Sequence, residues 1–526
     1  MSKTQPNFKY GKDYLTAGLA LQLTSGQLIG IIHKDTRQKI NTSRKAVEKL
    51  ANGDQAVYGI NTGFGPLCTT RISKNDTSRL QHNILKSHSV GVGPPIDEEI
   101  SKLMLVLKMH ALCQGYSGVA LSTLERILWH IENDVIPVVP CQGSVGASGD
   151  LAPLSHLFLP LIGLGKVYVN GKAYKAHNIL KKNGLEPLTL GAKEGLALIN
   201  GTQFIAAYAV KVLEKLKNCL SQADIIAGMM IEGLLGSSSP FMNELHRIRP
   251  YKGTRHVAHR MASLLKDSAI NASHTDCDRV QDPYSLRCVP QVHGASRNAW
   301  LHLKEMLEVE LNAVTDNPII LDEHHAISGG NFHGQPMALP LDYACLAASE
   351  IGSISDRRTY LSLTGIAADT PKLLMKDIGL NSAFMILQYT SAALASENKT
   401  LCFPASADSI PTSLGQEDHV SMGSISGRKA LQVVTNLEKI LAIELLCAAQ
   451  AFDFHRPLKS GPVLEAVHKL VRQKITHAEE DRVFADDIEK AISLVKDGTI
   501  IKVASEVDLT EQTDLQSEFE NLFEHI

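Results

Sequence analysis

The sequence has few aromatic residues and no closely spaced cysteine pairs. Phenylalanine, tryptophan and tyrosine make up 5% of its 526 residues, fewer than a strand-rich fold normally uses. The nine cysteines are an odd number, and no two of them form a CxxC motif. A disulfide framework and a zinc ribbon are therefore not predicted, and the cysteine usage fits a reducing compartment.

The chain also lacks a large excess of either charge and a long hydrophobic run. Fifty-two basic residues against 55 acidic ones give a net charge of -3, which argues against the basic surface typical of nucleic-acid-binding proteins. The longest uncharged stretch, residues 378–396, has too many amide and hydroxyl groups to span a membrane. The first ten residues contain no apolar segment of a secretory signal. We expect no nucleic-acid partner, no membrane partner and a cytoplasmic location.

The residues that are present allow a large, mainly helical core. Hydrophobic residues make up 44% of the chain and charged residues 20%, which is ordinary for a globular protein of this length. Apolar residues recur at helical spacing in several runs, and each run predicts one or more helices. The runs are residues 26–52, 80–85, 99–131, 203–235, 298–314, 337–364, 379–399, 424–452 and 461–475.

The character of the chain changes where the longest of these runs begin. Before them, Asn170-Gly171 lies between alternating residues and predicts a β-hairpin over residues 166–174. We therefore predict a mainly α protein with a mixed N-terminal domain over residues 1–198 and a long-helix bundle domain over residues 199–526. The acidic tail Glu506–Glu524 is expected to be a solvated helical end.

A glycine-rich loop over residues 140–153 contains the tripeptide Ala147-Ser148-Gly149. The unhindered Gly149 nitrogen can attack the Ala147 carbonyl in a tight turn, and Ser148 can then lose its hydroxyl as water. Loss of two waters in all would give a methylidene imidazolone, an electrophile that no ordinary side chain provides. The alternative is a glycine-rich turn before a helix, with Ser148 and Asp150 as cap residues.

The sequence around this tripeptide, GSVGASGDLAPLSH, resembles the signature of the aromatic amino acid ammonia-lyases. Further matches follow in family order between about residues 25 and 460. They are YGINTGFG at 58–65, GLALINGT at 195–202, QDPYSLR at 281–287, TDNP at 315–318, GNFH at 330–333 and PASADSIPTSLGQEDHVSM at 404–422. The resemblance implies an ammonia-lyase-like helical fold and a 4-methylidene-imidazol-5-one formed from Ala147-Ser148-Gly149, with no external cofactor.

The resemblance also implies a catalytic base, Tyr58, which opens the first of these motifs. A free tyrosine has a pKa of about 10, so we expect helix N-termini aimed at the site to lower it. By itself, a tyrosine at the start of a glycine-rich loop is more often a packing anchor.

Five further residues take roles from the same resemblance. The guanidinium of Arg287 matches a substrate carboxylate. Asn200 and Gln281 would position the prosthetic group and the substrate through hydrogen bonds, and Tyr284 would lie near the electrophile. Phe332 would pack against the electrophile or the substrate, although a core aromatic residue is an equally good interpretation.

Two positions predict the substrate. Ser87-His88 has the pattern of the family branch that acts on histidine, and a histidine can exchange a hydrogen bond with an imidazole. Glu417 can accept an imidazole N–H, or it can be a capping carboxylate beside Thr412 and Ser413. Ser87-His88 and Glu417 both argue against the alternative reactions, which are deamination of tyrosine or phenylalanine and the related 2,3-aminomutase reaction.

The resemblance implies a homotetramer in which each active site takes residues from three subunits. A helical assembly protein with an inactive site is the alternative from a different class, and the intact tripeptide, Tyr58 and Arg287 argue against it. The spacing of His256 and His259 does not match a metalloprotease motif, so we predict no metal site.

Overall fold

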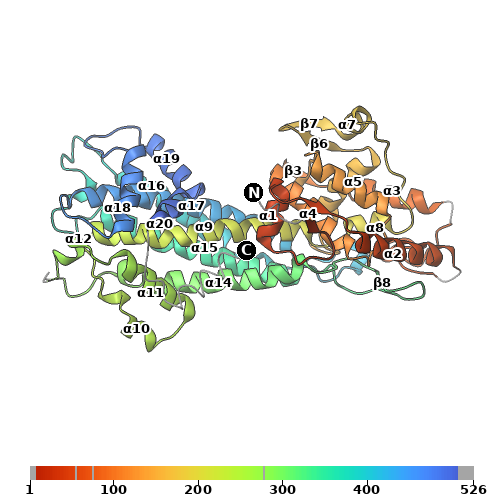
Figure 1. Ribbon diagram of the computed structural model, residues 1–526, viewed down its shortest axis with the longest axis horizontal. Helices are drawn as coiled ribbons and strands as arrows, with labels where there is room; N and C mark the ends of the chain where they lie inside the picture. The colour runs from red at the N-terminus through yellow and green to blue at the C-terminus, as the bar shows by residue number, and fades with distance from the viewer. Residues whose placement is uncertain (1–6, 54–55, 74–75, 276–278, 508–526) are drawn as a thin grey trace, which may run out of the picture.

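The computed structural model describes residues 7–53, 56–73, 76–275 and 279–507 (Figure 1). The protein is mainly helical, as the sequence predicts. The N-terminal elements gather at one end, and long helices extend from there to the other end (Figure 1). A domain boundary at residue 198 stays a prediction. The acidic tail that we expected to be helical lies outside the described residues from residue 508 onward.

The N-terminal part combines short helices with very short strands. The helices are α1 (Ala17–Ser25), α2 (Lys34–Asn52), α3 (Thr77–His88), α4 (Glu98–Cys113), α5 (Leu121–Glu132), α6 (Leu151–Phe158), α7 (Ala176–Lys182) and α8 (Glu194–Ile199). The strands are β1 (Phe8–Lys9), β2 (Gly30–Ile31), β3 (Val92–Pro95), β4 (Ile136–Pro137), β5 (Pro140–Gln142), β6 (Lys166–Val169) and β7 (Lys172–Lys175), with β8 (Ile319–Ile320) and β9 (Ala326–Ile327) later in the chain. Strand β1 pairs with β2 in parallel. The other pairs are antiparallel: β3 with β5, β6 with both β4 and β7, and β8 with β9.

The predicted hairpin is confirmed, and two of the predicted helical runs are interrupted. Asn170 and Gly171 adopt positive φ angles of 51° and 72° between β6 and β7, as a tight hairpin turn requires. The run that starts at residue 26 becomes helical only at Lys34, because Gly30–Ile31 pairs with β1. The run over residues 99–131 is divided into α4 and α5 at Gly118, whose φ is 68°. A Cβ on Gly118 would lie 2.1 Å from Val47, so only glycine fits there.

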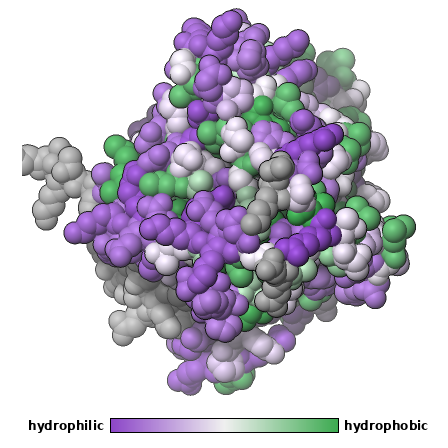
Figure 2. Space-filling view, turned by 90° about the vertical axis from the view of Figure 1, so that its right-hand side faces the viewer, coloured by the Kyte–Doolittle hydropathy of each residue, from purple (hydrophilic) through white to green (hydrophobic). Residues whose placement is uncertain are grey.

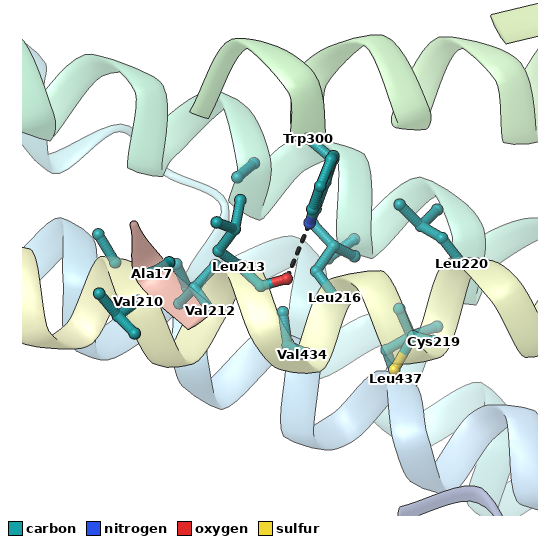
Figure 3. Packing of buried hydrophobic residues seen from close by; sticks show 14 of the residues in the cluster. Ala17, Val210, Val212, Leu213, Leu216, Cys219, Leu220, Trp300, Val434 and Leu437 are labelled. Atoms are coloured by element: carbon teal, nitrogen blue, oxygen red, sulfur yellow. Dashed lines mark hydrogen bonds between the residues drawn. The ribbon is translucent and has the colours of Figure 1, made fainter. Parts of the chain in front are cut away.

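The long helices pack side by side and form the core. They are α9 (Gln203–Gly233), α14 (Val289–Leu311), α15 (Gln335–Ser362), α16 (Met385–Leu401) and α17 (Gly423–Asp453). Trp300 of α14 is fully buried, and its indole N–H donates a hydrogen bond of 2.8 Å to the Leu213 carbonyl of α9 (Figure 3). Leucine and valine side chains of α9 and α17 surround this contact (Figure 3). The predicted long runs are confirmed as helices, with their ends shifted by up to nine residues, at the start of α14.

Shorter helices cover the far end of the long ones. They are α10 (Asn243–Arg247), α11 (Lys252–Leu264), α12 (Ala269–Ala272), α13 (Tyr284–Arg287), α18 (Pro462–Lys474), α19 (Phe484–Lys496) and α20 (Thr499–Glu506). At the opposite end, hydrophilic residues predominate on the surface and apolar residues occur in small groups (Figure 2). Among the described helices, none is both long enough and apolar enough to cross a membrane.

Helix starts follow directly after the predicted site motifs. Helix α6 begins three residues after Ser148, α9 three residues after Asn200, and α15 three residues after Phe332. Helix α17 begins at Gly423, after the segment that contains Glu417. The four motifs are thus placed at the N-terminal ends of helices, where the helix dipole favours negative charge.

Candidate active site

The Ala147-Ser148-Gly149 loop is held by the segment that precedes α9. The Gly201 N–H donates to the Ser148 carbonyl at 3.3 Å, and the Asp150 N–H donates to the Gly201 carbonyl at 2.8 Å. Gly149 has a φ of 78°, and a Cβ there would lie 2.1 Å from the Gly201 oxygen. A side chain at position 149 is therefore excluded, which leaves the Gly149 backbone unhindered.

Asp150 joins this loop to the start of α9. Its side chain is fully buried and accepts hydrogen bonds of 3.0 Å from the Ile205 N–H and the Ser144 hydroxyl. Burial raises the pKa of Asp150 to about 7, against the effect of these hydrogen bonds. Asp150 is at the N-cap position of α6, as the alternative interpretation of the loop expected, but its side chain does not cap that helix. The carboxylate satisfies an N–H in the first turn of α9, and its side chain makes no cap hydrogen bond to α6.

Ser148 and Glu417 meet across the site. The Ser148 hydroxyl donates to Oε1 of Glu417 at 3.0 Å, and the Thr412 hydroxyl donates to Oε2 at 2.8 Å. The start of α17 lies against the same loop, because the Met422 N–H donates to the Val145 carbonyl at 3.0 Å. Glu417 thus faces the tripeptide and also closes its own loop through Thr412.

Tyr58 lies at the same site, and its electrostatic surroundings differ from the expectation. Its phenol oxygen accepts a hydrogen bond of 3.2 Å from the Gly65 N–H. Burial raises the pKa of Tyr58, Cys68 and Glu417 raise it further, and the Gly65 hydrogen bond opposes them. The predicted lowering of this pKa is therefore wrong for the single chain, because desolvation outweighs the favourable contact.

His88 ends α3 beside this group. Its Nδ1 is 3.0 Å from the hydroxyl of Ser87, which lies on the exposed surface. Burial lowers the pKa of His88, while the Ile84 carbonyl and the charge of Glu417 oppose this change. The neutral imidazole is therefore favoured, and it can donate one hydrogen bond and accept another.

Two cavities place the predicted residues relative to each other. A cavity of about 580 Å³ is lined by Tyr58, His88, Ser148, Asn200 and Glu417, among others. A second cavity of about 540 Å³ has Tyr58, Ser148, Asn200 and Glu417 in common with it and is also lined by Ala147 and Phe332. Phe332 is half-buried at this wall. The structure thus brings together residues from motifs that are up to 359 positions apart in the sequence, Tyr58 and Glu417.

Besides Gly149, which adjoins Ser148 in the tripeptide, three predicted residues line neither cavity. Gln281, Tyr284 and Arg287 belong to the segment around α13, which packs against α14 and α15. Tyr284 is 70% exposed, and the Arg287 guanidinium lies over its ring, 4.6 Å from the centroid. The neighbouring α12 is at the opposite end of the molecule from α3 and α8 (Figure 1). Within a single chain, these three residues are therefore far from Ser148.

A buried charged group behind Asn200 was missed in the sequence. Lys193 forms an ion pair of 2.5 Å with Asp316, and the Asn200 amide donates to the Asn317 carbonyl at 2.8 Å. Lys108 donates to the backbone carbonyl of Asn200. The signal that could have found it is a single lysine inside the apolar run LMLVLKMHALC of α4.

The chain is similar to known lyases and aminomutases over most of its length. The profile of the aromatic amino acid lyase family matches residues 20–473. The histidine ammonia-lyase of Myxococcus xanthus is 44% identical over 95% of this chain and 98% of that protein. The histidine ammonia-lyase of Gloeobacter violaceus is 46% identical over 88% and 90%.

Solved structures give the same result. Histidine ammonia-lyase from Trypanosoma cruzi matches with a TM-score of 0.89 and 40% identity, over 98% of this chain and 97% of that one. Tyrosine aminomutase from Streptomyces globisporus matches with a TM-score of 0.90 and 33% identity, over 96% and 100%. With its tripeptide loop, its helical architecture and a profile match that covers most of its length, the chain belongs to the aromatic amino acid lyase family.

Proposed function

We propose that this protein is a carbon–nitrogen lyase that eliminates ammonia from L-histidine to give trans-urocanate, the first step of histidine degradation. The observation that carries the proposal is the contact between Ser148 and Glu417 in a cavity that Tyr58 and His88 also line. The relatives named histidine ammonia-lyase, at 44–46% identity, support it. The aminomutase of similar fold does not decide the substrate, because one fold serves several reactions.

The tripeptide residues fit the 4-methylidene-imidazol-5-one group of the family. In its formation the Gly149 nitrogen bonds to the Ala147 carbonyl carbon, and the carbonyl oxygen leaves as water. Ser148 then loses its Cα proton and its hydroxyl as a second water. The glycine backbone at position 149 and the Ser148 hydroxyl at the cavity wall support this assignment. When formed, the group supplies an electrophile that makes the substrate nitrogen a better leaving group.

Tyr58 would take the β-proton of the substrate as the general base. Its phenolate form is needed, and burial in the single chain opposes that form. Positive charge near Tyr58 in the assembled enzyme would favour it. The N-terminal ends of α6, α9 and α17 supply part of this charge at the tripeptide loop.

Glu417 and His88 would select the substrate ring. A carboxylate and a neutral histidine can both exchange hydrogen bonds with an imidazole, and neither has a partner in a phenyl ring. A site built to bond a polar substrate rejects an apolar analogue strongly, because its own buried groups are left without partners. The alternative substrates tyrosine and phenylalanine are therefore expected to react poorly.

The remaining site residues would come from other copies in a homotetramer. Gln281, Tyr284 and Arg287 are too far along the bundle to reach Ser148 of their own chain, so a neighbouring copy would supply the carboxylate-binding arginine. Large exposed apolar side chains on α15 and α16, including Leu346 and Tyr389, support an interface between copies. The cysteines within the described residues are scattered and form no disulfide, which supports a cytoplasmic location.

Urocanate formation tests the proposal. Purified protein is mixed with L-histidine, and urocanate is followed by its ultraviolet absorbance, with L-tyrosine and L-phenylalanine run in parallel. Urocanate formation that disappears in Ser148→Ala establishes both the substrate and the role of the tripeptide. Product from tyrosine or phenylalanine alone would overturn the roles given to His88 and Glu417. No turnover of any of the three would contradict the lyase function.

A further inference from the structure

Two lysines and an aspartate are buried behind the active-site wall. The exposed fractions are 1% for Lys108, 0% for Lys193 and 3% for Asp316. They come from α4, from the residue before α8 and from the loop after α14, so the three meet only in the folded chain. A buried charge is costly unless it is paired and hydrogen-bonded. Their contacts therefore indicate what the group holds in place.

Lys193 and Asp316 hold the side chain of Asn200. The Lys193 ammonium is 2.5 Å from Oδ2 of Asp316, and Oδ1 of Asp316 accepts from the Asn317 N–H at 2.7 Å. The Asn200 amide nitrogen is directed to the same place, 2.8 Å from the Asn317 carbonyl and 3.5 Å from Oδ1 of Asp316. These two contacts fix the orientation of the Asn200 side chain, which lines both cavities.

Lys108 holds the backbone of Asn200. Its ammonium donates to the Asn200 carbonyl, which belongs to the peptide unit shared with Gly201. The N–H of this unit donates to the Ser148 carbonyl at 3.3 Å, and the Gly201 carbonyl accepts from the Asp150 N–H at 2.8 Å. A hydrogen-bond donor on the carbonyl of a peptide polarises its N–H, because hydrogen bonds in a chain strengthen one another. Lys108 is therefore two hydrogen bonds from the carbonyl of Ser148.

We propose that Lys108 is a positioning residue of the active site, which holds the Asn200–Gly201 peptide against Ser148–Asp150 and strengthens its hydrogen bond to the Ser148 carbonyl. The inference rests on the proposed function, and it gives Lys108 no contact with the substrate. In the prosthetic group the Ser148 carbonyl would remain as the exocyclic carbonyl of the ring. A strong donor on that oxygen withdraws electrons from the ring and favours its electrophilic character.

The surroundings of Lys108 agree with a group that is tuned as well as buried. Burial, with a smaller effect of Lys193 in the same direction, lowers the pKa of Lys108 to about 7, although Asp316 and Asp150 oppose this change. Asp150 is the same carboxylate that anchors the tripeptide loop to α9. The charges behind Asn200 and those behind Ser148 thus form one electrostatic group.

Lys102 provides a matched control on the same helix. It lies six residues before Lys108 on α4, it is 9% exposed, and its ammonium is 2.5 Å from Asp134. It lines neither of the two cavities. Lys102→Met therefore removes a largely buried lysine from α4 without changing the Asn200–Gly201 peptide. Its Tm reports how much stability is lost when such a charge is removed from the fold.

The experiment compares Lys108→Met, Lys108→Gln, Lys102→Met and Ser148→Ala with the wild type. Intact mass gives the fraction of chains that have lost two waters, Tm gives stability, and urocanate formation gives kcat and KM. We expect Lys108→Met to have a smaller dehydrated fraction, and to lose about tenfold or more in kcat per dehydrated chain with little change in KM. Gln keeps an N–H donor without the charge, so Lys108→Gln is expected to lie between Met and wild type. Lys102→Met is expected to match the wild type in the dehydrated fraction and in kcat.

Each other outcome overturns a stated claim. A folded Lys108→Met with full dehydration and an unchanged kcat overturns the positioning role, and so does an equal loss in Lys102→Met. If Met and Gln at position 108 both prevent folding, Lys108 serves the core and the proposal fails. A wild type that keeps both waters and makes no urocanate contradicts the proposed function instead, independently of Lys108.

Discussion

The Ser148 hydroxyl donates a 3.0 Å hydrogen bond to Oε1 of Glu417, which lies 269 positions later in the chain. This contact joins the residue that would form the electrophile to the residue that would recognise the substrate ring. The negative charge of Glu417 also raises the pKa of Tyr58 and acts to raise that of His88. A single carboxylate therefore affects Ser148, Tyr58 and His88, which we propose as the source of the electrophile, the base and the specificity residue.

Glu417→Gln should change substrate recognition more than folding. Glutamine has nearly the same shape, and its amide oxygen can still accept from Ser148 or Thr412 while its NH2 donates to the other hydroxyl, but it lacks the charge that favours an imidazole N–H. We expect kcat/KM for L-histidine to fall about 100-fold, with Tm nearly unchanged. The measurement is urocanate formation over a range of histidine concentrations.

Thr412→Val is the control for this variant. It removes the 2.8 Å hydrogen bond to Oε2 of Glu417 and leaves the carboxylate in place. The loss in kcat/KM should be well below that of Glu417→Gln. Equal losses would show that loop geometry, and not the charge, explains the effect.

Tyr58→Phe should abolish the base and leave the prosthetic group intact. General base catalysis contributes roughly 100- to 10,000-fold to a rate, so kcat should fall within that range. The chain should still be two waters lighter than its sequence, because Tyr58 contributes no atom to the tripeptide. Tyr116→Phe, at a loop outside both cavities, should leave kcat unchanged. Loss of the dehydrated mass in Tyr58→Phe would instead give this residue a role in forming the group.

The raised pKa of Tyr58 predicts how activity should change with pH. Burial raises the pKa of Tyr58, so in this environment the phenolate fraction grows only as the pH rises above neutrality. We expect kcat/KM to increase with pH on the alkaline side, with a slope of about one on a logarithmic plot. A flat profile over that range would mean that another group removes the proton, or that the assembly lowers this pKa well below neutrality.

How much could be predicted from the sequence depended on the range of the contacts involved. The Asn170-Gly171 hairpin and the long helices follow from local pattern and were predicted. The start of α2 was misplaced because it depends on the pairing of Gly30–Ile31 with β1, about 20 residues earlier. The contact of the Asp150 side chain could not be predicted for a similar reason, because its partner is the Ile205 N–H of another helix.

The proposed site residues could be named from motifs in the sequence, but their arrangement in space could not be predicted. Nothing local indicates that Glu417 reaches Ser148, or that Arg287 is kept away from both by the length of the bundle. Lys108 was missed because one lysine in an apolar helix resembles a long side chain that extends to solvent. Its burial depends on Asn200 and Asp316, which no local pattern connects with α4.

Subunit mixing should reveal whether one site uses more than one chain. Tyr58→Phe and Arg287→Ala are each expected to be nearly inactive alone. If Arg287 acts on a neighbouring copy, hybrids mixed one to one contain some sites with both residues intact. Random assembly then restores about a quarter of the wild-type activity. Unfolding the two variants together and refolding them provides the hybrids, and refolding each alone is the control. No recovery would place both residues in the same site of one chain or exclude Arg287 from the reaction.

Asp453 should make stability depend on pH at the end of the bundle far from Ser148. Although burial opposes it, hydrogen bonds of 2.7 Å from His468 and His477 and the charge of Arg472 hold the pKa of Asp453 well below its usual range. The pKa is lower in the folded state, so the ionised carboxylate stabilises the fold above its unfolded pKa of about 4, and this stabilisation is lost as the pH falls through the lower folded pKa. Asp453→Asn should therefore lower Tm at neutral pH, and its difference from the wild type should shrink as the pH falls below about 4. Glu186→Gln removes an exposed carboxylate and should show little change at any pH. A difference for Asp453→Asn that is constant from neutral to acid pH would show that shape and hydrogen bonding, and not charge, explain its contribution.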